Sequence, residues 1–392
     1  MTVFSSSIPN LQIVWDSTSL RSLQHCPYKY KLEILEGWRQ IEAVDLEFGG
    51  MYQTAVEAFQ KARLSGSSKE EAQDLALKTI LEISGQYDDE GKWVPWGGAY
   101  LDRWRCLGQA GIKCTVCEGK NKKQCEACRG TGYENGLRAY RNEQGNRAKC
   151  PWSHAGKWFL GDGPSTCGSC GSPTERGNHW VAYHPTKNRY SLVRLVIWFC
   201  EEQDETKGLQ PYRFPDGTAA VELNGVIPLG GHAPSGEEYH LAVNIDEIVS
   251  FGSENFILDN KSTGRSAGKF YFSQFSPDVQ FDTYDMVGAI LFPDLNLSGV
   301  MVRAAQTMSG GARFQIHTIY KTQEQREEHW RDTQYWIKEA EKHALEDRWP
   351  QNKSKCAMCQ FNGVCSRPAS DREDALEENF VKRPRWNPIE RR

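Results

Sequence analysis

The chain has 392 residues, with 51 acidic and 47 basic side chains and a formal net charge of −4. This length suffices for one large domain or for two to three ordinary domains with a substantial core. The negative balance argues against a protein that coats nucleic acid with its whole surface, although local basic patches can still bind it. No run of 18 apolar residues occurs, so we expect no membrane span. The first residues lack the basic and apolar regions of a secretion signal, so we expect a protein of the reducing cytoplasm.

The first hundred residues predict a mainly helical segment. Residues 17–38 open with Ser and Thr, which suit a helix N-cap, and Pro27 is placed to begin a second helix, because proline fits the first turn. Residues 49–64 carry an apolar stripe at helical spacing, and residues 68–84 begin with a capping sequence.

The composition changes at Cys106, and from there to His179 the chain is rich in Gly, Cys, Lys and Asn and poor in periodic apolar residues. Such a segment cannot build a stable core without a cross-link, which is either a disulfide or a bound metal. Thirteen cysteines in a reducing compartment favour the metal. Two CxxC pairs with seven residues between them suit one tetrahedral Zn²⁺; they are Cys114, Cys117, Cys125 and Cys128. The second pair continues as CxxC-x-G-x-G and resembles the cysteine-rich domain of DnaJ-type chaperones, which supports a metal knuckle and not a chaperone role.

A second zinc site is predicted from three further cysteines, Cys150, Cys167 and Cys170. His154 is the preferred fourth ligand, and His179 is the alternative. In the competing interpretation Cys150 is simply buried, or Cys106 joins the set instead. Both predicted sites have four protein ligands and no position for water, which is typical of structural zinc.

Beyond Trp180, alternating and β-branched segments predict five strands. They are Val221–Leu229, Tyr239–Val249, Asn255–Lys261, Gly299–Ala304 and Arg313–Tyr320. A helix over Asp278–Phe292 lies between the third and fourth strands, and residues 323–345 predict a long helix with one aromatic and apolar stripe. This order predicts an α/β fold in which helices flank a mixed sheet.

Residues 240–263 predict two strands joined by a turn at residues 251–253. Asp259 and Lys261 are two apart on the second strand and project to the same face, and the turn can bring Asp246 beside them. Two carboxylates suit a hard divalent cation such as Mg²⁺, which keeps positions for water and phosphate, and a lysine beside them can stabilise developing charge. The alternative is a β-hairpin with a surface salt bridge.

Gln280 and Tyr284 lie four apart on the helix predicted over residues 278–292 and face the same way. Their polar and aromatic tips suit phosphate or base contacts, and the alternative is an ordinary half-buried tyrosine with a surface glutamine. At the end of the chain, residues 381–392 form a basic patch that can contact nucleic acid, or else a solvated, disordered terminus.

Three cysteines near the C-terminus, Cys356, Cys359 and Cys365, need a fourth ligand from elsewhere. Cys26, Cys106 and Cys200 are the unassigned cysteines. Four thiolates, one of them from a cysteine distant in the sequence, can hold either zinc or an iron–sulfur cluster.

In combination these motifs resemble the PD-(D/E)XK nucleases of the RecB type. More narrowly, they resemble the iron–sulfur branch, which includes the AddB nuclease domain and the CRISPR-associated exonucleases. The resemblance covers the first sixty residues and roughly residues 221–365. It rests on Cys26 in HCPYKY, Glu222, Asp246, Asp259-Asn-Lys261, Gln280-x3-Tyr284 and the final CxxC-x5-C.

The resemblance implies a [4Fe–4S] cluster on Cys26, Cys356, Cys359 and Cys365, which would staple the two ends of the domain and close a very long loop. It also implies a catalytic centre in which Asp246 and Asp259 bind Mg²⁺ or Mn²⁺, Glu222 lies near that metal, and Lys261 has an acid/base or electrostatic role. Gln280 and Tyr284 would shape the site and contact DNA.

The domain plan that follows is a helical start of the nuclease domain over residues 1–105, a zinc-binding insertion over 106–179, a nuclease core over 180–345, an iron–sulfur closing segment over 346–370 and a basic tail over 371–392. One departure is Gln53, at the position where many members of the family carry a metal-binding histidine. A glutamine offers only a neutral oxygen, so we expect weaker metal binding there.

We therefore expect a Mg²⁺- or Mn²⁺-dependent DNA exonuclease that acts on single-stranded ends in recombination, repair or CRISPR-related DNA processing, in the cytoplasm of a prokaryotic or phage-infected cell. A helicase, recombinase or integrase is the expected kind of protein partner. One alternative is a DNA-binding or recombination-partner protein that keeps the nuclease fold as a scaffold. Another is an endonuclease of a phage replication or defence system.

Overall fold

The computed structural model describes ten stretches of the chain. They are residues 1–40, 44–87, 91–106, 158–161, 165, 167, 174–184, 186–202, 208–308 and 311–390. The chain divides into two compact units, one made of Met1–Ser84 together with Arg189–Arg392, and the other of Gly85–Asn188. The range of the insertion expected at 106–179 falls inside the second unit.

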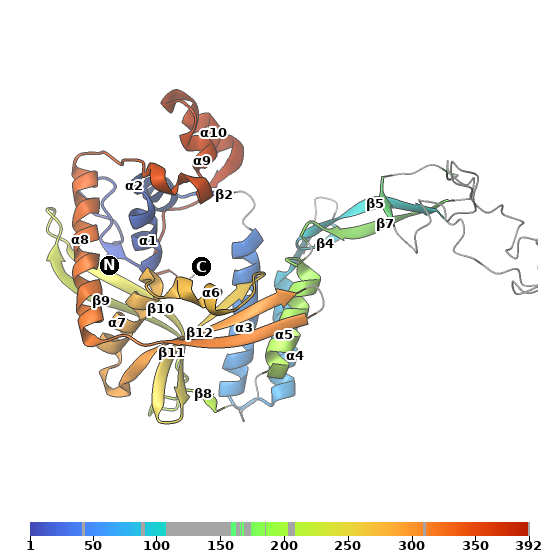
Figure 1. The fold of residues 1–392 in the computed structure, drawn as a ribbon, viewed down its shortest axis with the longest axis horizontal. Helices are drawn as coiled ribbons and strands as arrows, with labels where there is room; N and C mark the ends of the chain where they lie inside the picture. The colour runs from blue at the N-terminus through green and yellow to red at the C-terminus, as the bar shows by residue number, and fades with distance from the viewer. Residues whose placement is uncertain are drawn as a thin grey trace, which may run out of the picture. The chain divides into compact units, whose positions relative to one another are not determined.

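A seven-stranded mixed sheet forms the centre of the first unit (Figure 1). Its strands are β1 (Val14–Trp15), β8 (Leu209–Pro211), β9 (Val221–His232), β10 (Glu238–Phe251), β11 (Glu254–Thr263), β12 (Leu297–Met308) and β13 (Gly311–Ile319). The β1–β10 and β11–β12 pairs are parallel, and the other pairs are antiparallel. The five strands predicted from alternation are β9 to β13, and the predicted α/β class with a mixed sheet is confirmed.

Helices cover both faces of this sheet (Figure 1). The longer ones are α1 (Ser17–His25), α3 (Val44–Leu64), α4 (Lys69–Ile83), α5 (Arg189–Glu202), α7 (Val279–Leu291), α8 (Gln323–Leu345) and α10 (Arg372–Asn379). The short ones are α2 (Pro27–Tyr30), η1 (Lys31–Leu35), α6 (Lys269–Phe272), η6 (Ser273–Phe275), η7 (Pro293–Leu295), η8 (Lys353–Met358), α9 (Asn362–Cys365) and η9 (Ala369–Asp371). Helices α1, α7 and α8 pack together, as do α3, α4 and α5. Capping boxes begin α1, α4 and α8, and Pro27 occupies the first turn of α2 as predicted.

Helix α5 was missed by the sequence analysis, which treated the chain beyond Trp180 as strand-like. Leu192, Leu195, Val196 and Phe199 are fully buried, at the i, i+3, i+4 and i+7 spacing of one helical face. The ring of Phe199 makes an edge-to-face contact with Tyr52 at 6.0 Å between centroids. A short apolar run is compatible with a buried strand or a buried helix, and here packing against α3 and α4 decided for the helix.

Strand β10 positions the candidate site. Along one edge it pairs with β9 and then with β8. Along the other edge it pairs with β1 at His240 and Leu241, and then with β11 from Glu247 onward. Between these two partners, over residues 242–246, no described strand pairs with this edge of β10. The sheet therefore has a gap there, and the gap leaves room for side chains and a ligand.

The C-terminal segment folds back onto the first unit. Strand β14 (Phe380–Lys382) pairs with β2 (Trp38–Gln40), and the ring of Phe380 stacks on Phe361 at 4.8 Å between centroids. Gly37, with a φ of +80°, brings its backbone so close to Arg383 that a Cβ atom would collide with the carbonyl. Residues up to 390 are therefore ordered and not a disordered terminus, because backbone pairing and the side chains of Phe380 and Pro388 hold them, while residues 381–385 stay exposed.

The second unit contains a β3–β4 hairpin, formed by β3 (Gly85–Tyr87) and β4 (Trp93–Pro95), and a three-stranded sheet. The sheet has the order β6-β5-β7, with β5 (Gly98–Cys106), β6 (Phe159–Leu160) and β7 (Thr174–Ala182). Trp104 packs on Phe159 at 5.2 Å between ring centroids. In the part of the chain that is described, no helix combines the length and apolar character needed to cross a bilayer.

Candidate active site and cysteine pocket

Two carboxylates and one ammonium meet beside the gap in the sheet. Asp259 and Lys261 lie on the same side of β11, with Lys261 Nζ 2.9 Å from Asp259 Oδ2. The ladder between β10 and β11 ends at the Glu247–Leu258 pair. Just beyond it, Asp246 Oδ2 accepts a hydrogen bond of 3.1 Å from the backbone N–H of Asn260. The β10–β11 turn thus brings Asp246 to Asp259 and Lys261, as predicted.

Helix α7 adds two more of the predicted residues. Gln280 Nε2 donates to Asp259 Oδ1 at 3.1 Å and to the Tyr284 hydroxyl at 2.8 Å, and its Oε1 accepts from Lys261 Nζ at 3.3 Å. The N-cap of α7 is Asp278, whose carboxylate accepts the N–H of Gln280 and so fixes the first turn. One glutamine therefore holds both the carboxylate and the ammonium in place.

Burial makes the two carboxylates costly to ionise. It raises the pKa of Asp246 to about 7, with the charge of Asp259 acting in the same direction. Burial also raises the pKa of Asp259, against the opposing effect of Lys261. Oδ2 of Asp259 is buried and ion-paired with Lys261, and it accepts no hydrogen bond from the described residues. Carboxylate oxygens are the ligands that Mg²⁺ and Mn²⁺ take, and a divalent cation would offset the repulsion of the two acids.

A cleft of about 330 Å³ opens onto this cluster. Asp246, Gln280 and Tyr284 line it, together with Glu222 at the start of β9. Gln53 lines it from α3, and its Oε1 is buried without a hydrogen-bond partner among the described residues. The structure thus brings the position of the expected histidine to the same cleft as Asp246. Asp259 does not line the cleft itself and is joined to its lining through the hydrogen bond from Gln280.

Several residues of the cleft were missed by the sequence analysis. Asp16 is the N-cap of α1, and burial raises the pKa of its carboxyl. Asn244 lies two residues before Asp246 on β10, and Trp386 and Glu390 come from the C-terminal segment. The helix-capping pattern around Asp16 was visible in the sequence. No local pattern could place Trp386 or Glu390 here, because they meet the cleft only through tertiary folding.

A buried polar layer supports the cluster from beneath. Glu247 is 1 % exposed and Arg303 is 5 % exposed. Gln60 of α3 donates to the Glu247 carboxylate, and Arg303 donates to Asn260 Oδ1 at 3.3 Å. Burial raises the pKa of Glu247 to about 7. This layer connects α3 and β12 to the residues on either side of the two aspartates.

All four cysteines of the predicted cluster, one near the N-terminus and three near the C-terminus, line one pocket. They are Cys26, Cys356, Cys359 and Cys365. Asn352 N–H lies 3.2 Å from Cys26 Sγ, so the two ends of the chain meet at this point. Among the alternatives, Cys200 is buried in α5 and does not line the pocket, and burial raises the pKa of its thiol to about 12.

Burial raises the pKa of Cys365 to about 11, and the neighbouring cysteines act in the same direction. Thiolates at this point need a positively charged centre to stabilise them. In the described part of the chain, no group of three or more His, Cys, Asp or Glu side chains is arranged to hold a metal ion. Thiolates are ligands of both zinc and iron–sulfur clusters, and the cluster stays a prediction.

Most of the predicted zinc ligands lie outside the described residues. They are Cys114, Cys117, Cys125, Cys128, Cys150, His154 and Cys170. Cys167 is described and is buried, and His179 lies on β7. Both zinc sites remain predictions.

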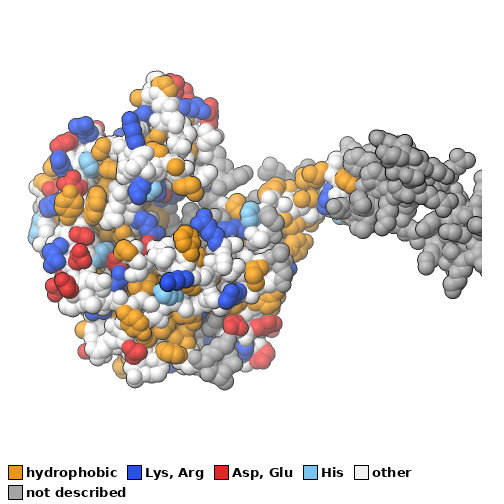
Figure 2. Space-filling model, in the orientation of Figure 1, with side chains coloured by type: hydrophobic (Ala, Val, Ile, Leu, Met, Phe, Trp, Pro, Cys, Tyr) orange, Lys and Arg blue, Asp and Glu red, His pale blue; other side chains and the backbone are white. Residues whose placement is uncertain are grey.

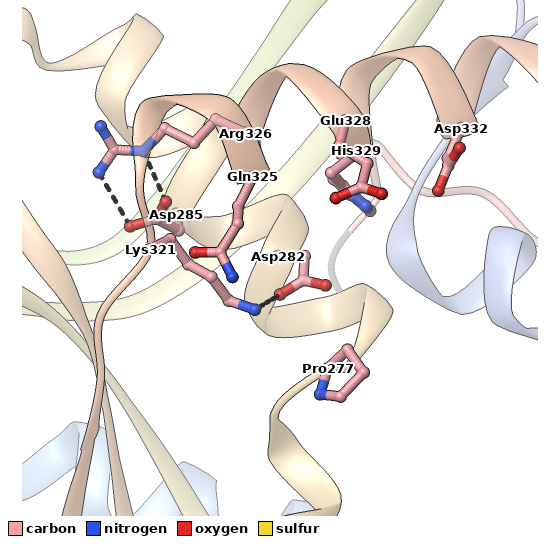
Figure 3. Close-up of a pocket in the computed structure, with 9 residues that line it drawn as sticks. All are labelled: Pro277, Asp282, Asp285, Lys321, Gln325, Arg326, Glu328, His329 and Asp332. Atoms are coloured by element: carbon pink, nitrogen blue, oxygen red, sulfur yellow. Dashed lines mark hydrogen bonds and ion pairs between the residues drawn. The ribbon is translucent and has the colours of Figure 1, made fainter.

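A second cavity, of about 320 Å³, lies between α7 and α8 (Figure 3). Lys321 is paired with Asp282 at 2.7 Å, and Arg326 with Asp285 at 2.6 Å. With 3.6 residues per turn, the two aspartates lie on the side of α7 opposite Gln280. These pairs join α7 to α8, and so they hold the helix that carries Gln280.

Comparisons with known proteins add little to this geometry. No family model matches the chain, and no curated protein matches it. Among solved structures, it is similar to a chain described as "Crystal structure of SSO0001". The identity is 12 % and the TM-score 0.21, over 37 % of this chain and 59 % of that chain.

Proposed function

We propose that this protein is a metal-dependent deoxyribonuclease of the PD-(D/E)XK type, which hydrolyses phosphodiester bonds at single-stranded DNA ends. The observation that carries the proposal is the convergence of Asp246, Asp259 and Lys261 at the gap in the sheet, with Gln280 bonded to two of them. A surface salt bridge does not explain this arrangement, because Asp259 is 1 % exposed and sits beside the half-buried carboxylate of Asp246.

In this proposal Asp246 and Asp259 hold the metal ion, and Glu222 and Gln53 line the cleft beside Asp246. A bound Mg²⁺ or Mn²⁺ would lower the pKa of a water molecule and neutralise charge on the phosphate. Lys261 places an ammonium next to the position of the attacked phosphate and stabilises the charge that develops there. Gln280 keeps Lys261 and Asp259 in a fixed geometry through hydrogen bonds to both.

Exposed side chains just after β11 support a nucleic-acid substrate. After β11 the chain continues through Arg265 and Lys269, both exposed, to Phe270, whose side chain is 92 % exposed. Figure 2 shows Lys and Arg side chains on the viewed face of the first unit in the region of α6 and β12. Cations that bind phosphates next to an aromatic ring that stacks on bases are typical of single-strand binding.

The cysteine pocket supports the second part of the proposal, a [4Fe–4S] cluster on Cys26, Cys356, Cys359 and Cys365. Its role would be structural: these thiolates join the segment around α1 and α2 to the segment around η8 and α9. Leu20 and Leu23 of α1 pack in the main core, whereas Phe361 and Val364 pack with Leu32 and Trp38 in a separate small core.

A second candidate function is DNA binding without cleavage, and Gln53 favours it. Its neutral oxygen replaces a metal-binding imidazole, and this oxygen has no hydrogen-bond partner among the described residues. Weak metal binding would leave a nuclease fold that holds DNA and does not cut it.

Degradation of end-labelled single-stranded DNA in the presence of Mn²⁺ tests the proposal. We expect the wild-type chain to shorten the DNA, and the Asp259→Asn variant to leave it intact while it still binds. The matched control is Asp294→Asn, because Asp294 is exposed in η7 and does not line the cleft. Binding without cleavage by the wild type, unchanged in Asp246→Ala, would establish the second candidate instead.

A further inference from the structure

The C-terminal segment forms one wall of the candidate catalytic cleft. After β14, the N–H of Arg383 donates to Gly37 O at 2.9 Å, and the N–H of Trp386 donates to Ile34 O at 3.1 Å. The indole Nε1 of Trp386 donates to Asp16 Oδ2 at 2.9 Å. Backbone and side chain therefore anchor Trp386 against the start of α1.

Beyond this anchor, the chain runs along β10. Pro388 is buried, and its carbonyl lies 3.5 Å from Nδ2 of Asn244, two residues before Asp246. Asn387, Pro388 and Glu390 line the cleft together with Asp246 and Glu222. The segment thus adds a carboxylate to a cleft that is already acidic, on the side formed by β10 and the start of α1.

We infer that residues 386–390 block one side of the cleft and so restrict the proposed nuclease to the ends of DNA strands. This inference rests on the proposed function. An internal phosphate can reach Asp246 and Asp259 only if the strand continues away from them in both directions. A terminal phosphate needs a free path in one direction only.

Two physical effects oppose a continuous strand on the side of this segment. The first is steric, because Trp386 and Pro388 fill space against Asp16 and Asn244. The second is electrostatic, because the Glu390 carboxylate repels the next phosphate along the strand. The anchor at Trp386 makes this wall a part of the fold and not a passing contact of a free terminus.

The test compares the full chain with a variant that lacks residues 388–392 and keeps the Trp386 anchor. A control variant that lacks only Arg391 and Arg392 separates the loss of the wall from the loss of two positive charges. Circular and linear single-stranded DNA of the same sequence are the substrates, with Mn²⁺ as the metal, and thermal unfolding verifies that all three chains are folded.

We expect the full chain and the control to degrade linear DNA and to spare circles, and the shortened chain to cut circles at a rate within about tenfold of the linear rate. Cutting of circles by the full chain would overturn the inference, as would a shortened chain that still spares them while it degrades linear DNA. Both of these outcomes would leave metal-dependent cleavage of DNA intact, and cutting of circles would remove only its restriction to ends.

If none of the three chains cuts any DNA, the proposed function fails. The inference about residues 386–390 is then tested separately, by the binding of DNA. Fluorescence anisotropy in Ca²⁺ compares an oligonucleotide that has free ends with one of the same sequence closed into a circle. A preference of the full chain for free ends that disappears in the shortened chain supports the wall. Equal binding of both oligonucleotides by the full chain, or a preference that the shortened chain retains, overturns it.

Discussion

Nζ of Lys261 lies 2.9 Å from Oδ2 of Asp259, two residues earlier on the same strand. Gln280 of α7 bonds to both side chains, so their relative position depends on a strand and a helix together. Such a pair is preorganised.

We predict that Lys261→Met lowers kcat for DNA cleavage on the order of 10²-fold or more, because it removes a charge that acts on the transition state. KM for DNA should change little, because exposed cations elsewhere provide most of the phosphate contacts. Steady-state kinetics with labelled DNA measures both constants. Lys78→Met is the matched control, since Lys78 is exposed on α4. An unchanged kcat in Lys261→Met would remove this lysine from the mechanism.

The buried Glu247 should make the protein less stable as the pH rises from about 4.5 to 7. Burial raises its pKa from 4.5 to about 7 in the folded chain, so the folded state binds more protons than the unfolded state in this window. The stabilisation is complete below the unfolded pKa and is lost as the pH rises through the folded one. It corresponds to about 3 kcal/mol for an isolated group.

The Glu247→Gln variant should show a flatter dependence of the unfolding free energy on pH in this window. Urea unfolding at several pH values measures this slope. Above about pH 7 the absolute stability of the variant should also fall, because buried Arg303 then loses a nearby negative charge, so the slope below pH 7 is decisive. Equal slopes for both proteins would show that Glu247 does not titrate as the structure indicates.

The ion pair between Arg326 and Asp285 should be a main support of α7. The Asp285 side chain is fully buried, and Arg326 donates to both of its oxygens, at 2.6 and 3.2 Å. Arg326→Ala leaves a buried carboxylate without its partner, so we predict a loss of about 3 kcal/mol in the free energy of unfolding.

Arg367→Ala is the control for this prediction, because the Arg367–Glu378 pair is exposed and should contribute at most about 1 kcal/mol. The double variant Arg326→Met with Asp285→Leu should recover most of the loss, since it removes both charges. A single variant as stable as the wild type in urea unfolding would mean that the pair does not hold α7.

Anaerobically purified protein should contain about four iron atoms per chain in the cluster. Cys26→Ala should lose this iron and its visible absorption, whereas Cys200→Ala should keep both, because Cys200 lies in α5 away from the pocket. Removal of the cluster with a chelator should lower stability on the order of 5 kcal/mol by the loop-closure estimate, since Cys26 and Cys356 enclose most of the chain. Zinc in place of iron, with the same loss in Cys26→Ala, would assign a zinc site to this pocket.

Local patterns in the sequence by themselves determined much of the fold. Alternation identified β9 to β13, and helical spacing with caps identified α1, α3, α4, α7 and α8, because these signals depend on neighbours a few residues apart. The two-residue spacing of Asp259 and Lys261 and the turn after Phe251 were likewise enough to predict that Asp246 joins them.

Only the tertiary structure decided the features that depend on distant partners. The sequence left Cys26, Cys106 and Cys200 open as the fourth thiolate, and long-range packing placed Cys26 beside the C-terminal three. The same is true of α5, whose apolar run fits a strand or a helix until it packs on α3. The wall formed by Trp386 and Glu390 has no local signal at all, because its position depends on strand pairing between residues more than 300 apart in the sequence.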